Sequence, residues 1–314
     1  MYIGIDIGGT KCAVLLADQD GRILHKHRFP TADKDKTLAN ILETVIRLKN
    51  EADQNIKSVG ISCGGPLDSK RGLILSPPNL PGWDRVPITD LVCSAVGANA
   101  YLCNDANACA LAEWRFGAGV GSNNMIFLTF GTGLGAGLIL NGRLYEGSNG
   151  NAGECGHIRL SDHGPVGYGK IGSFEGFCSG GGLAQIGRSL ALVAIQQGSP
   201  AEWCKEAGNL VDIDAKILQD YADRGDPIAT EAYRICGEKL GLGLSILMDL
   251  FDPDCIVLGS IYARAEHLLR EHALRVMQRE TLFQSLNHCR ILPAKLGEEI
   301  GDYAAIAIAM QGGK

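Results

Sequence analysis

The chain has 314 residues, of which 20% are charged, and a formal net charge of −6. This length suits two domains of ordinary size, and the scattered Lys and Arg residues argue against a nucleic-acid surface. The longest apolar runs fall well short of the roughly 18 residues that span a bilayer, and the N-terminus has no basic leader. We therefore expect a soluble, cytoplasmic protein that acts on neither nucleic acid nor membranes.

The 11 cysteines are spaced singly, and no Cys-x-x-Cys pair occurs. This spacing is not that of a metal site or a disulfide framework. In a reducing compartment such cysteines mostly behave as small buried hydrophobes, and this is what we predict for them.

Residues 2–17 predict a strand, a glycine turn and a second strand. Gly8 and Gly9 could form a simple hairpin turn, since glycine accepts positive φ at little cost. A simple hairpin, however, needs neither Asp6 before the turn nor Thr10 and Lys11 after it. Exposed backbone N–H groups beside a carboxylate suit a phosphate and its Mg²⁺ ion.

The next segments alternate between helix and strand, which favours an α/β fold. Residues 36–51 predict an amphipathic helix and 58–62 a strand, followed by a glycine turn at 63–68. Residues 76–83 contain three prolines and predict a rigid loop. Asn79 either holds this loop through its side chain or contacts a bound sugar, and spacing alone favours the first role.

A polar pair, Asn104 and Asp105, stands where the apolar run 101–103 ends and a helix begins. A helix N-cap, worth about 1 kcal/mol, explains one of the two residues. Ligands of open α/β sheets bind beyond the carboxyl ends of strands, so Asp105 is a candidate general base. The helix ends at 116–119, where we place the domain boundary.

Residues 125–142 repeat the opening pattern of strand, glycine turn and strand, so the chain is predicted to be internally duplicated. The repeated Gly-x-Gly is not a dinucleotide-binding fingerprint, because that motif needs a helix directly after the glycines. A P-loop motif is also absent from the sequence.

Glu154 and His157 lie three residues apart on a glycine-rich segment, where a structural and a ligand-binding role are both open. Residues 164–182 are predicted to be mainly loop and carry Glu175. Helices are predicted at 187–196, 214–222 and 226–250, and a buried strand at 255–258. A last helix, 301–310, is expected to pack on the first domain.

Five motifs together resemble the ROK family (repressors, open reading frames, kinases) of the actin-like and hexokinase-like ATPase superfamily. They are Asp-Ile-Gly-Gly-Thr-Lys at 6–11, Asn-Leu-Pro-Gly-Trp at 79–83, Asn-Asp-Ala-Asn at 104–107, Gly-Thr-Gly-Leu-Gly-Ala-Gly at 131–137 and Ala-Gly-Glu-Cys-Gly-His at 152–157. The resemblance extends over residues 2–309.

The resemblance implies two ribonuclease-H-like lobes with a sugar-binding cleft between them. Residues 1–118 with 301–314 would form the N-terminal lobe and 119–300 the C-terminal lobe. It also implies ATP and Mg²⁺ as cofactors and a homodimer. Asp105 would take the proton from the primary hydroxyl of the sugar, and Asp6 would help to place Mg²⁺. The implied sugar contacts are Gly65, Asn79, Asn104, Asp105, Glu154, His157 and Glu175. The implied ATP contacts are Gly8, Gly9, Thr10, Lys11, Gly131, Thr132, Gly133, Gly135 and Gly259.

The chain departs from the family at residues 166–173, Val-Gly-Tyr-Gly-Lys-Ile-Gly-Ser. Many members carry three zinc-binding cysteines in this run, which act with the loop histidine. Zinc needs four ligands, His157 alone cannot supply them, and His163 and Cys178 do not restore the spacing. We therefore predict no structural zinc. Gly64 and Ser260 are smaller departures, and Ser260 leaves the adenosine contacts less defined.

The resemblance predicts a kinase that makes a sugar 6-phosphate by in-line attack on the γ-phosphate of ATP. Glucose, N-acetylated hexosamines, mannose, fructose, allose and β-glucosides remain open as substrates. The alternative is a sugar-responsive regulator of the ROK repressor type, which would carry a DNA-binding domain before the first strand at Tyr2. A sugar-binding protein without activity is disfavoured because Asp6, Asp105 and both glycine turns are present.

Overall fold

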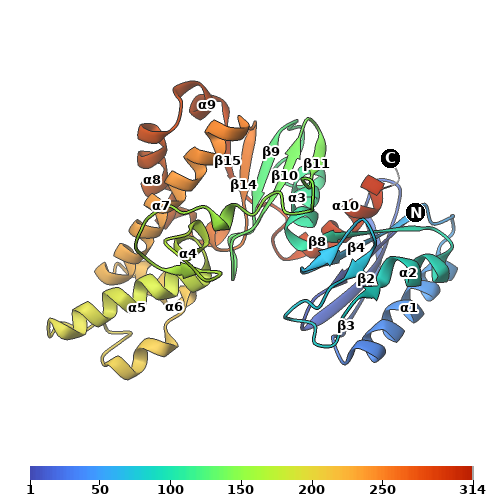
Figure 1. Cartoon of the computed structure of the whole chain (residues 1–314), viewed down its shortest axis with the longest axis horizontal. Coiled ribbons are helices and arrows are strands. Elements are labelled where there is room, and N and C mark those ends of the chain that lie inside the picture. Colours follow the sequence, from blue (N-terminus) through green and yellow to red (C-terminus); the bar gives the residue numbers. More distant parts are fainter. Residues whose placement is uncertain (313–314) are drawn as a thin grey trace.

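The computed structural model describes residues 1–312 and contains two five-stranded sheets of the same topology (Figure 1). The N-terminal sheet has the order β3-β2-β1-β4-β8, and the C-terminal sheet the order β11-β10-β9-β14-β15. In each sheet the first strand pairs antiparallel with the second and parallel with the fourth. The predicted internal duplication is therefore confirmed. The last two residues of the expected N-terminal lobe, 313 and 314, lie outside the described residues.

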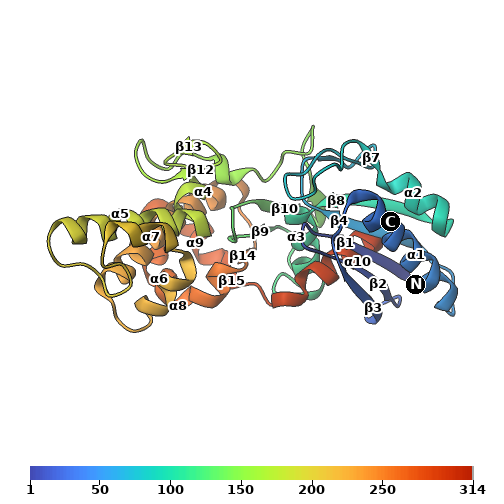
Figure 2. The same ribbon diagram turned by 90° about the horizontal axis from the view of Figure 1, so that it is seen from below.

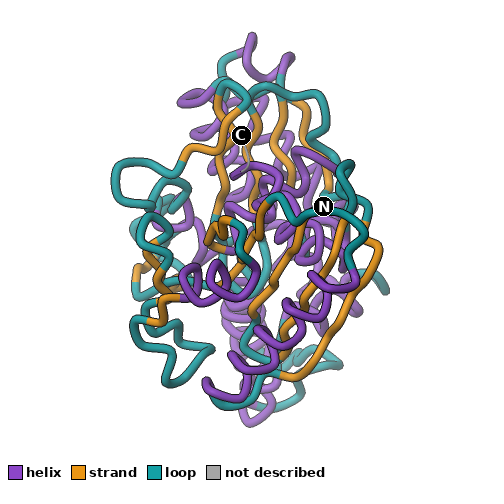
Figure 3. The backbone as a smooth tube through the Cα atoms, turned by 90° about the vertical axis from the view of Figure 1, so that its right-hand side faces the viewer, coloured by secondary structure: helices purple, strands orange, loops and turns teal. Residues whose placement is uncertain are grey.

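The N-terminal lobe is built on its sheet and two helices that cover one face of it (Figure 3). Its strands are β1 (Tyr2–Ile7), β2 (Lys11–Ala17), β3 (Ile23–Pro30), β4 (Ser58–Cys63) and β8 (Asn99–Asn104), and its helices are α1 (Lys34–Glu51) and α2 (Ile88–Val96). Three short strands, β5 (Leu67–Asp68), β6 (Leu73–Ile74) and β7 (Val86–Pro87), form a separate small sheet. The predicted helix at 36–51 begins two residues earlier, because the Asp33 side chain caps it through the Lys36 N–H.

The C-terminal lobe packs long helices against its own sheet. The strands are β9 (Met125–Leu128), β10 (Ala136–Leu140), β11 (Arg143–Tyr145), β14 (Cys255–Leu258) and β15 (Arg290–Pro293). The helices are α4 (Phe174–Phe177), α5 (Gly180–Gln196), α6 (Ala215–Ala222), α7 (Pro227–Phe251), α8 (Ile261–Glu280) and α9 (Phe283–His288). A two-stranded hairpin, β12 (Val166–Gly167) and β13 (Lys170–Ile171), precedes α4, and single 3₁₀ turns occur at η1 (Cys155–His157), η2 (Ala207–Asp212) and η3 (Gly297–Glu299).

The segment 164–182 was predicted to be mainly loop. This prediction is wrong for residues 180–182, which form the first turn of α5. The Ser179 hydroxyl accepts a hydrogen bond from the Gly182 N–H and caps the helix. A Cβ atom at Gly182 would lie 2.1 Å from the Gly176 carbonyl oxygen, so tertiary packing requires glycine there. The predicted helices at 214–222 and 226–250 are confirmed to within one residue at each end.

Two helices, α3 (Asp105–Phe116) and α10 (Ile300–Gly312), lie side by side between the two sheets (Figures 1 and 2). The predicted packing of the last helix on the first domain is confirmed, since α10 lies against β1 and β4. This close approach depends on Gly4 and Gly60, which pair in register. A Cβ atom at Gly60 would lie 2.1 Å from the Ala305 carbonyl oxygen. Helix α3 packs on α10 and also on β9 and β10 of the C-terminal sheet. An apolar cluster therefore joins the two lobes.

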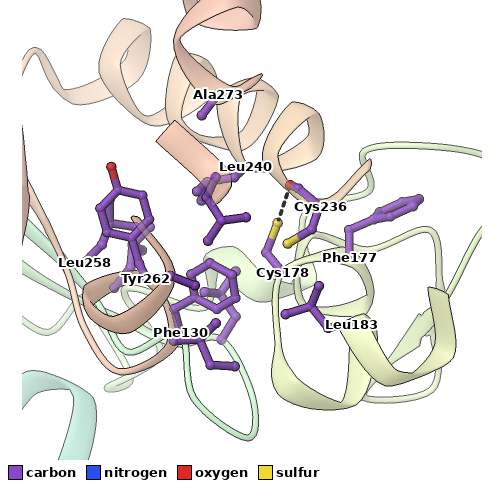
Figure 4. Close-up of a cluster of buried hydrophobic side chains, with 14 of the residues drawn as sticks. Phe130, Phe177, Cys178, Leu183, Cys236, Leu240, Leu258, Tyr262 and Ala273 are labelled. Atoms are coloured by element: carbon purple, nitrogen blue, oxygen red, sulfur yellow. Dashed lines mark hydrogen bonds between the residues drawn. The ribbon is translucent and has the colours of Figure 1, made fainter. Parts of the chain in front are cut away.

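The C-terminal core contains aromatic, aliphatic and cysteine side chains (Figure 4). The Cys178 thiol lies 3.6 Å from the Cys236 carbonyl oxygen, within hydrogen-bond reach. All 11 cysteines are free thiols, and most of them are buried, as predicted. Burial raises the pKa of the Cys63 thiol to about 12, which makes it a poor nucleophile. Among the described helices, none is long and apolar enough to cross a membrane.

Candidate active site

Three parallel strands of the N-terminal sheet end in register and place the predicted site residues at one edge. Ile7 pairs with Cys63, and Cys63 pairs with Asn104. Three segments therefore leave the sheet side by side. They are the first glycine turn after β1, the pair Gly64 and Gly65 after β4, and Asp105 after β8. This is the carboxyl edge, where open α/β sheets bind their ligands.

Asn104 and Asp105 make different contacts at the start of α3. The Asn104 Oδ1 accepts a hydrogen bond from the Asn107 N–H at 2.8 Å, so Asn104 is the cap of α3. Its amide nitrogen is still able to donate to a ligand. The Asp105 carboxylate accepts from the Ala106 N–H at 2.9 Å and remains open to solvent. The surrounding protein nevertheless raises its pKa by desolvation, which the backbone N–H groups partly offset.

Asp6 lies at the same edge and is largely enclosed. Burial, followed by repulsion from Asp302 and Asp105, raises its pKa to about 6. Asp302 is a member of this charge cluster that sequence reasoning missed. It is buried on α10 and pairs with Lys26 and Arg28 of β3. No local pattern could have shown this pairing, because Lys26 and Asp302 are 276 positions apart.

The first glycine turn and the proline-rich loop pack on each other. The Gly8 N–H donates to the Lys11 carbonyl at 3.1 Å and closes the turn. A Cβ atom at Gly9 would lie 2.7 Å from the backbone oxygen of Asn79. Glycine is therefore required here by the neighbouring backbone. Thr10 and Lys11 are exposed beside the turn.

The second glycine turn is anchored in the C-terminal core by Phe130. This residue is fully buried among the core side chains (Figure 4). Its φ is +34°, and its carbonyl oxygen accepts a hydrogen bond from the Ile261 N–H at 3.0 Å. Behind it, the Thr129 hydroxyl accepts from the Gly135 N–H at 3.0 Å. Sequence reasoning missed both residues, although both directly follow an apolar strand at the carboxyl edge of the sheet.

Further elements gather at this second turn. The Gly131 N–H donates to the Gly133 carbonyl at 3.0 Å, and the Gly180 N–H donates to the Gly131 carbonyl at 2.8 Å. The N-terminus of α5 therefore abuts the turn, and helix N-termini favour anions. Thr132 belongs to the same turn. Gly259 follows β14, whose residue Leu258 pairs with Leu128 of β9, so Gly259 leaves the sheet beside the turn.

The second glycine turn contacts residues from both lobes. A Cβ atom at Gly135 would lie 3.5 Å from the Ala106 Cβ, next to Asp105. On its other side the Leu134 N–H donates to the Glu175 Oε2 at 3.0 Å. The structure therefore brings the candidate base, the second turn and Glu175 into one contiguous region.

The remaining predicted sugar contacts lie around the region formed by Asp105, the second glycine turn and Glu175. A Cβ atom at Gly156 would lie 3.3 Å from the Glu175 Cβ, so η1 with Glu154 and His157 lies beside Glu175. Glu154 and His157 are both exposed. Gly65 stands at the same sheet edge as Asp105, and a Cβ atom there would lie 4.0 Å from the Leu67 backbone nitrogen.

The region around Asp6 fits a magnesium ion bound together with nucleotide phosphates. Mg²⁺ prefers carboxylate oxygens and usually keeps only one or two protein ligands beside phosphates and water. Asp6 lies two residues before Gly8 of the first glycine turn and supplies such an oxygen. Within residues 1–312 no group of three or more His, Cys, Asp or Glu side chains is placed to hold a metal ion.

The duplicated sheets and their two glycine turns define a protein of two ribonuclease-H-like lobes, the fold of the actin-like ATPases. A model of the ROK family matches residues 2–311, and the chain belongs to this family.

The similar proteins include glucokinases and a putative repressor. The chain is 33% identical to a glucokinase from Streptomyces coelicolor, over 82% of this chain and 81% of the relative. It is similar to the crystal structure of a ROK glucokinase from Streptomyces griseus in complex with glucose and AMPPNP, with a TM-score of 0.73, 32% identity and 99% of each chain covered. It is also 27% identical to a putative xylose repressor from a Caldicellulosiruptor species, over 99% of this chain and 78% of the relative.

Proposed function

We propose that this protein is an ATP-dependent kinase that transfers the γ-phosphoryl group to the 6-hydroxyl of a hexose or hexose derivative. Its class is that of phosphotransferases with an alcohol group as acceptor. The observation that carries the proposal is the close approach of Ala106 to Gly135, where an added Cβ atom would lie 3.5 Å from the Ala106 Cβ. It supports the proposal because Ala106 directly follows Asp105, a carboxylate with a raised pKa, and the turn that contains Gly135 is suited to phosphates.

In the proposed reaction Asp105 accepts the proton of the sugar hydroxyl as the oxygen attacks the γ-phosphorus. A raised pKa makes this carboxylate a better proton acceptor near neutral pH. The backbone N–H groups of the two glycine turns hold the phosphates, together with Thr10, Lys11 and Thr132, and Gly259 lies near the adenosine. Asp6 would hold Mg²⁺, which when bound neutralises charge on the phosphates.

The sugar is proposed to lie between Asn79, Asn104 and Gly65 on one side and Glu154, His157 and Glu175 on the other. These side chains and backbone groups are donors and acceptors suited to hydroxyl groups. Residues 1–118 with the C-terminal helix would form one moving lobe and 119–300 the other. A homodimer is also expected, which sedimentation velocity would test.

The proposal is tested by ADP release with MgATP over a panel of sugars. The panel contains glucose, mannose, fructose, allose, N-acetylglucosamine, N-acetylmannosamine and a β-glucoside. We expect ADP release with at least one of them, and a product phosphorylated at the 6-position by NMR. The alternative is a sugar-responsive regulator, which the similarity to a putative xylose repressor supports. Sugar binding without ADP release for any member of the panel would favour this alternative.

A further inference from the structure

A groove lies beside the proposed sugar site, between η1 and the β12–β13 hairpin. It is lined by His157, Arg159, Asp162, Tyr168, Lys170 and Ile171. None of these except His157 has a role in the proposed phosphoryl transfer. The groove is the part of the chain where the sequence departs from the zinc-binding members of its family.

Tyr168 and Gly169 form the two-residue turn at the tip of the hairpin, between the paired residues Gly167 and Lys170. The side chain of Tyr168 is 86% exposed, and the φ values of +45° at Tyr168 and +75° at Gly169 are those that a two-residue hairpin turn requires. The Tyr168 ring meets the His157 imidazole edge to face, with 5.7 Å between ring centroids. The turn therefore holds an exposed aromatic ring beside His157, which is a proposed sugar contact.

The hairpin that carries Tyr168 is fixed to the rest of the site. The Lys170 ammonium donates to the His157 carbonyl at 2.6 Å, and the Arg159 guanidinium donates to the Ile171 carbonyl at 2.7 Å. At the base of the hairpin, a Cβ atom at Gly167 would lie 2.8 Å from the Glu175 Cβ. The groove is therefore held next to two proposed sugar contacts, Glu175 and His157.

We propose that this groove binds a second sugar ring, joined by a glycosidic bond to the hexose that is phosphorylated. The exposed ring of Tyr168 offers a flat apolar surface to the C–H face of a pyranose. Arg159, Lys170 and Asp162 supply donors and an acceptor for its hydroxyl groups. The inference rests on the proposed function, because it places the first ring against His157 and Glu175.

Calorimetric titration of disaccharides against their monosaccharides, without ATP, tests the subsite. The probes are glucose with cellobiose and maltose, and N-acetylglucosamine with chitobiose. We expect wild-type protein to bind one disaccharide at least about fivefold more tightly than its monosaccharide, as one aromatic contact supplies. Tyr168→Ala should reduce this ratio to about one, whereas Tyr168→Phe, which keeps the ring, should preserve it.

Phe283→Ala is the matched control, because Phe283 is an aromatic residue of α9, 73% exposed and outside the groove. It should leave the ratio unchanged. If no disaccharide is preferred, or if Tyr168→Ala weakens monosaccharide and disaccharide equally, the subsite is refuted and Tyr168 serves only to orient His157. A protein that binds no sugar at all refutes the proposed function itself, so the two failures are distinguishable.

Discussion

The Glu113 carboxylate accepts a hydrogen bond from the Leu296 N–H at 2.8 Å, although the two residues are 183 positions apart. The same carboxylate accepts from the Ala118 N–H at 2.7 Å and the Lys295 N–H at 3.2 Å. Glu113 is fully buried on α3. Ala118 lies on the connection from α3 to β9, and Lys295 and Leu296 lie on the connection from β15 to α10. One buried side chain therefore fastens both connections between the proposed lobes.

Replacing Glu113 by alanine should destabilise the protein strongly. Three N–H groups in partly buried hydrogen bonds would lose their acceptor, and each unsatisfied group costs about 1–3 kcal/mol. We expect the free energy of unfolding, measured with urea, to fall by about 3–5 kcal/mol. Glu43→Ala is the control, since Glu43 is an exposed glutamate on α1. If Glu113→Ala lowers the free energy of unfolding no more than the control does, Glu113 does not stabilise the two connections.

Asp105→Asn should abolish phosphoryl transfer while sugar binding survives. A positioned base contributes about 10²–10⁴-fold, and the amide keeps the shape of the carboxylate but cannot accept the proton. The helix cap is unaffected, because the cap is Asn104. Steady-state kinetics would measure kcat, and calorimetry would measure the dissociation constant of the sugar.

The exposed Asp90 on α2 provides the matched control, as Asp90→Asn should leave kcat unchanged. An Asp105→Asn enzyme that keeps more than about a tenth of the wild-type kcat would exclude Asp105 as the base.

Asp6→Asn should stabilise the nucleotide-free protein above pH 6 although it weakens catalysis. In the folded chain the pKa of Asp6 is about 6, above the usual 3.8, so folding disfavours its ionised form. This penalty is absent well below pH 3.8, grows as the pH rises and is complete above the folded-state pKa of about 6. It amounts to about 3 kcal/mol at pH 7.5 and about 1 kcal/mol at pH 4.5.

Urea unfolding of wild type and Asp6→Asn at these two pH values measures the difference. Asp20→Asn serves as the control, since Asp20 is an exposed carboxylate of the same type. A variant less stable than wild type at pH 7.5 would show that ionised Asp6 is favoured by folding, contrary to this argument.

The parts of the site that were predictable from the sequence are those whose signal is local. The strand, glycine turn and strand around Gly8 and the strand end at Asp105 each lie within one short stretch. Glu113 and Asp302 gave no such signal, because their partners come from distant parts of the chain. The glycine run at 180–182 was misassigned because glycine disfavours helix interiors, whereas here a serine cap and close packing override that preference.

The protein should contain no stoichiometric zinc and should keep its activity after chelation once Mg²⁺ is resupplied. The reason is ligand count, since a structural zinc contributes to folding only with a complete four-ligand shell. The hydrogen bonds of Lys170 and Arg159 to backbone carbonyls already join the hairpin to the segment of His157. Elemental analysis that finds about one zinc per chain would overturn this prediction and point to His157, His163 and Cys178 as ligands.

A bound sugar should draw the two lobes together. The proposed contacts are divided between the lobes, with Asn104 and Asp105 on one and His157 and Glu175 on the other, so neither lobe completes the site alone. Closure would exclude water that could otherwise accept the phosphoryl group. The bending should occur near 117–121 and 297–301, the connections that adjoin the Glu113 hydrogen bonds.

Small-angle X-ray scattering with and without a substrate sugar measures this closure. Asp105→Asn extends the test, because a variant that binds sugar without turnover should close as wild type does. We expect a smaller radius of gyration at saturation and slower proteolysis at the two connections. A sugar that is not bound should change neither quantity. The two readouts are linked, because lobes that move toward each other bury surface and restrict the backbone at the connections. If both stay constant while calorimetry shows full occupancy, the site is preformed, and the sugar does not lie between two moving lobes.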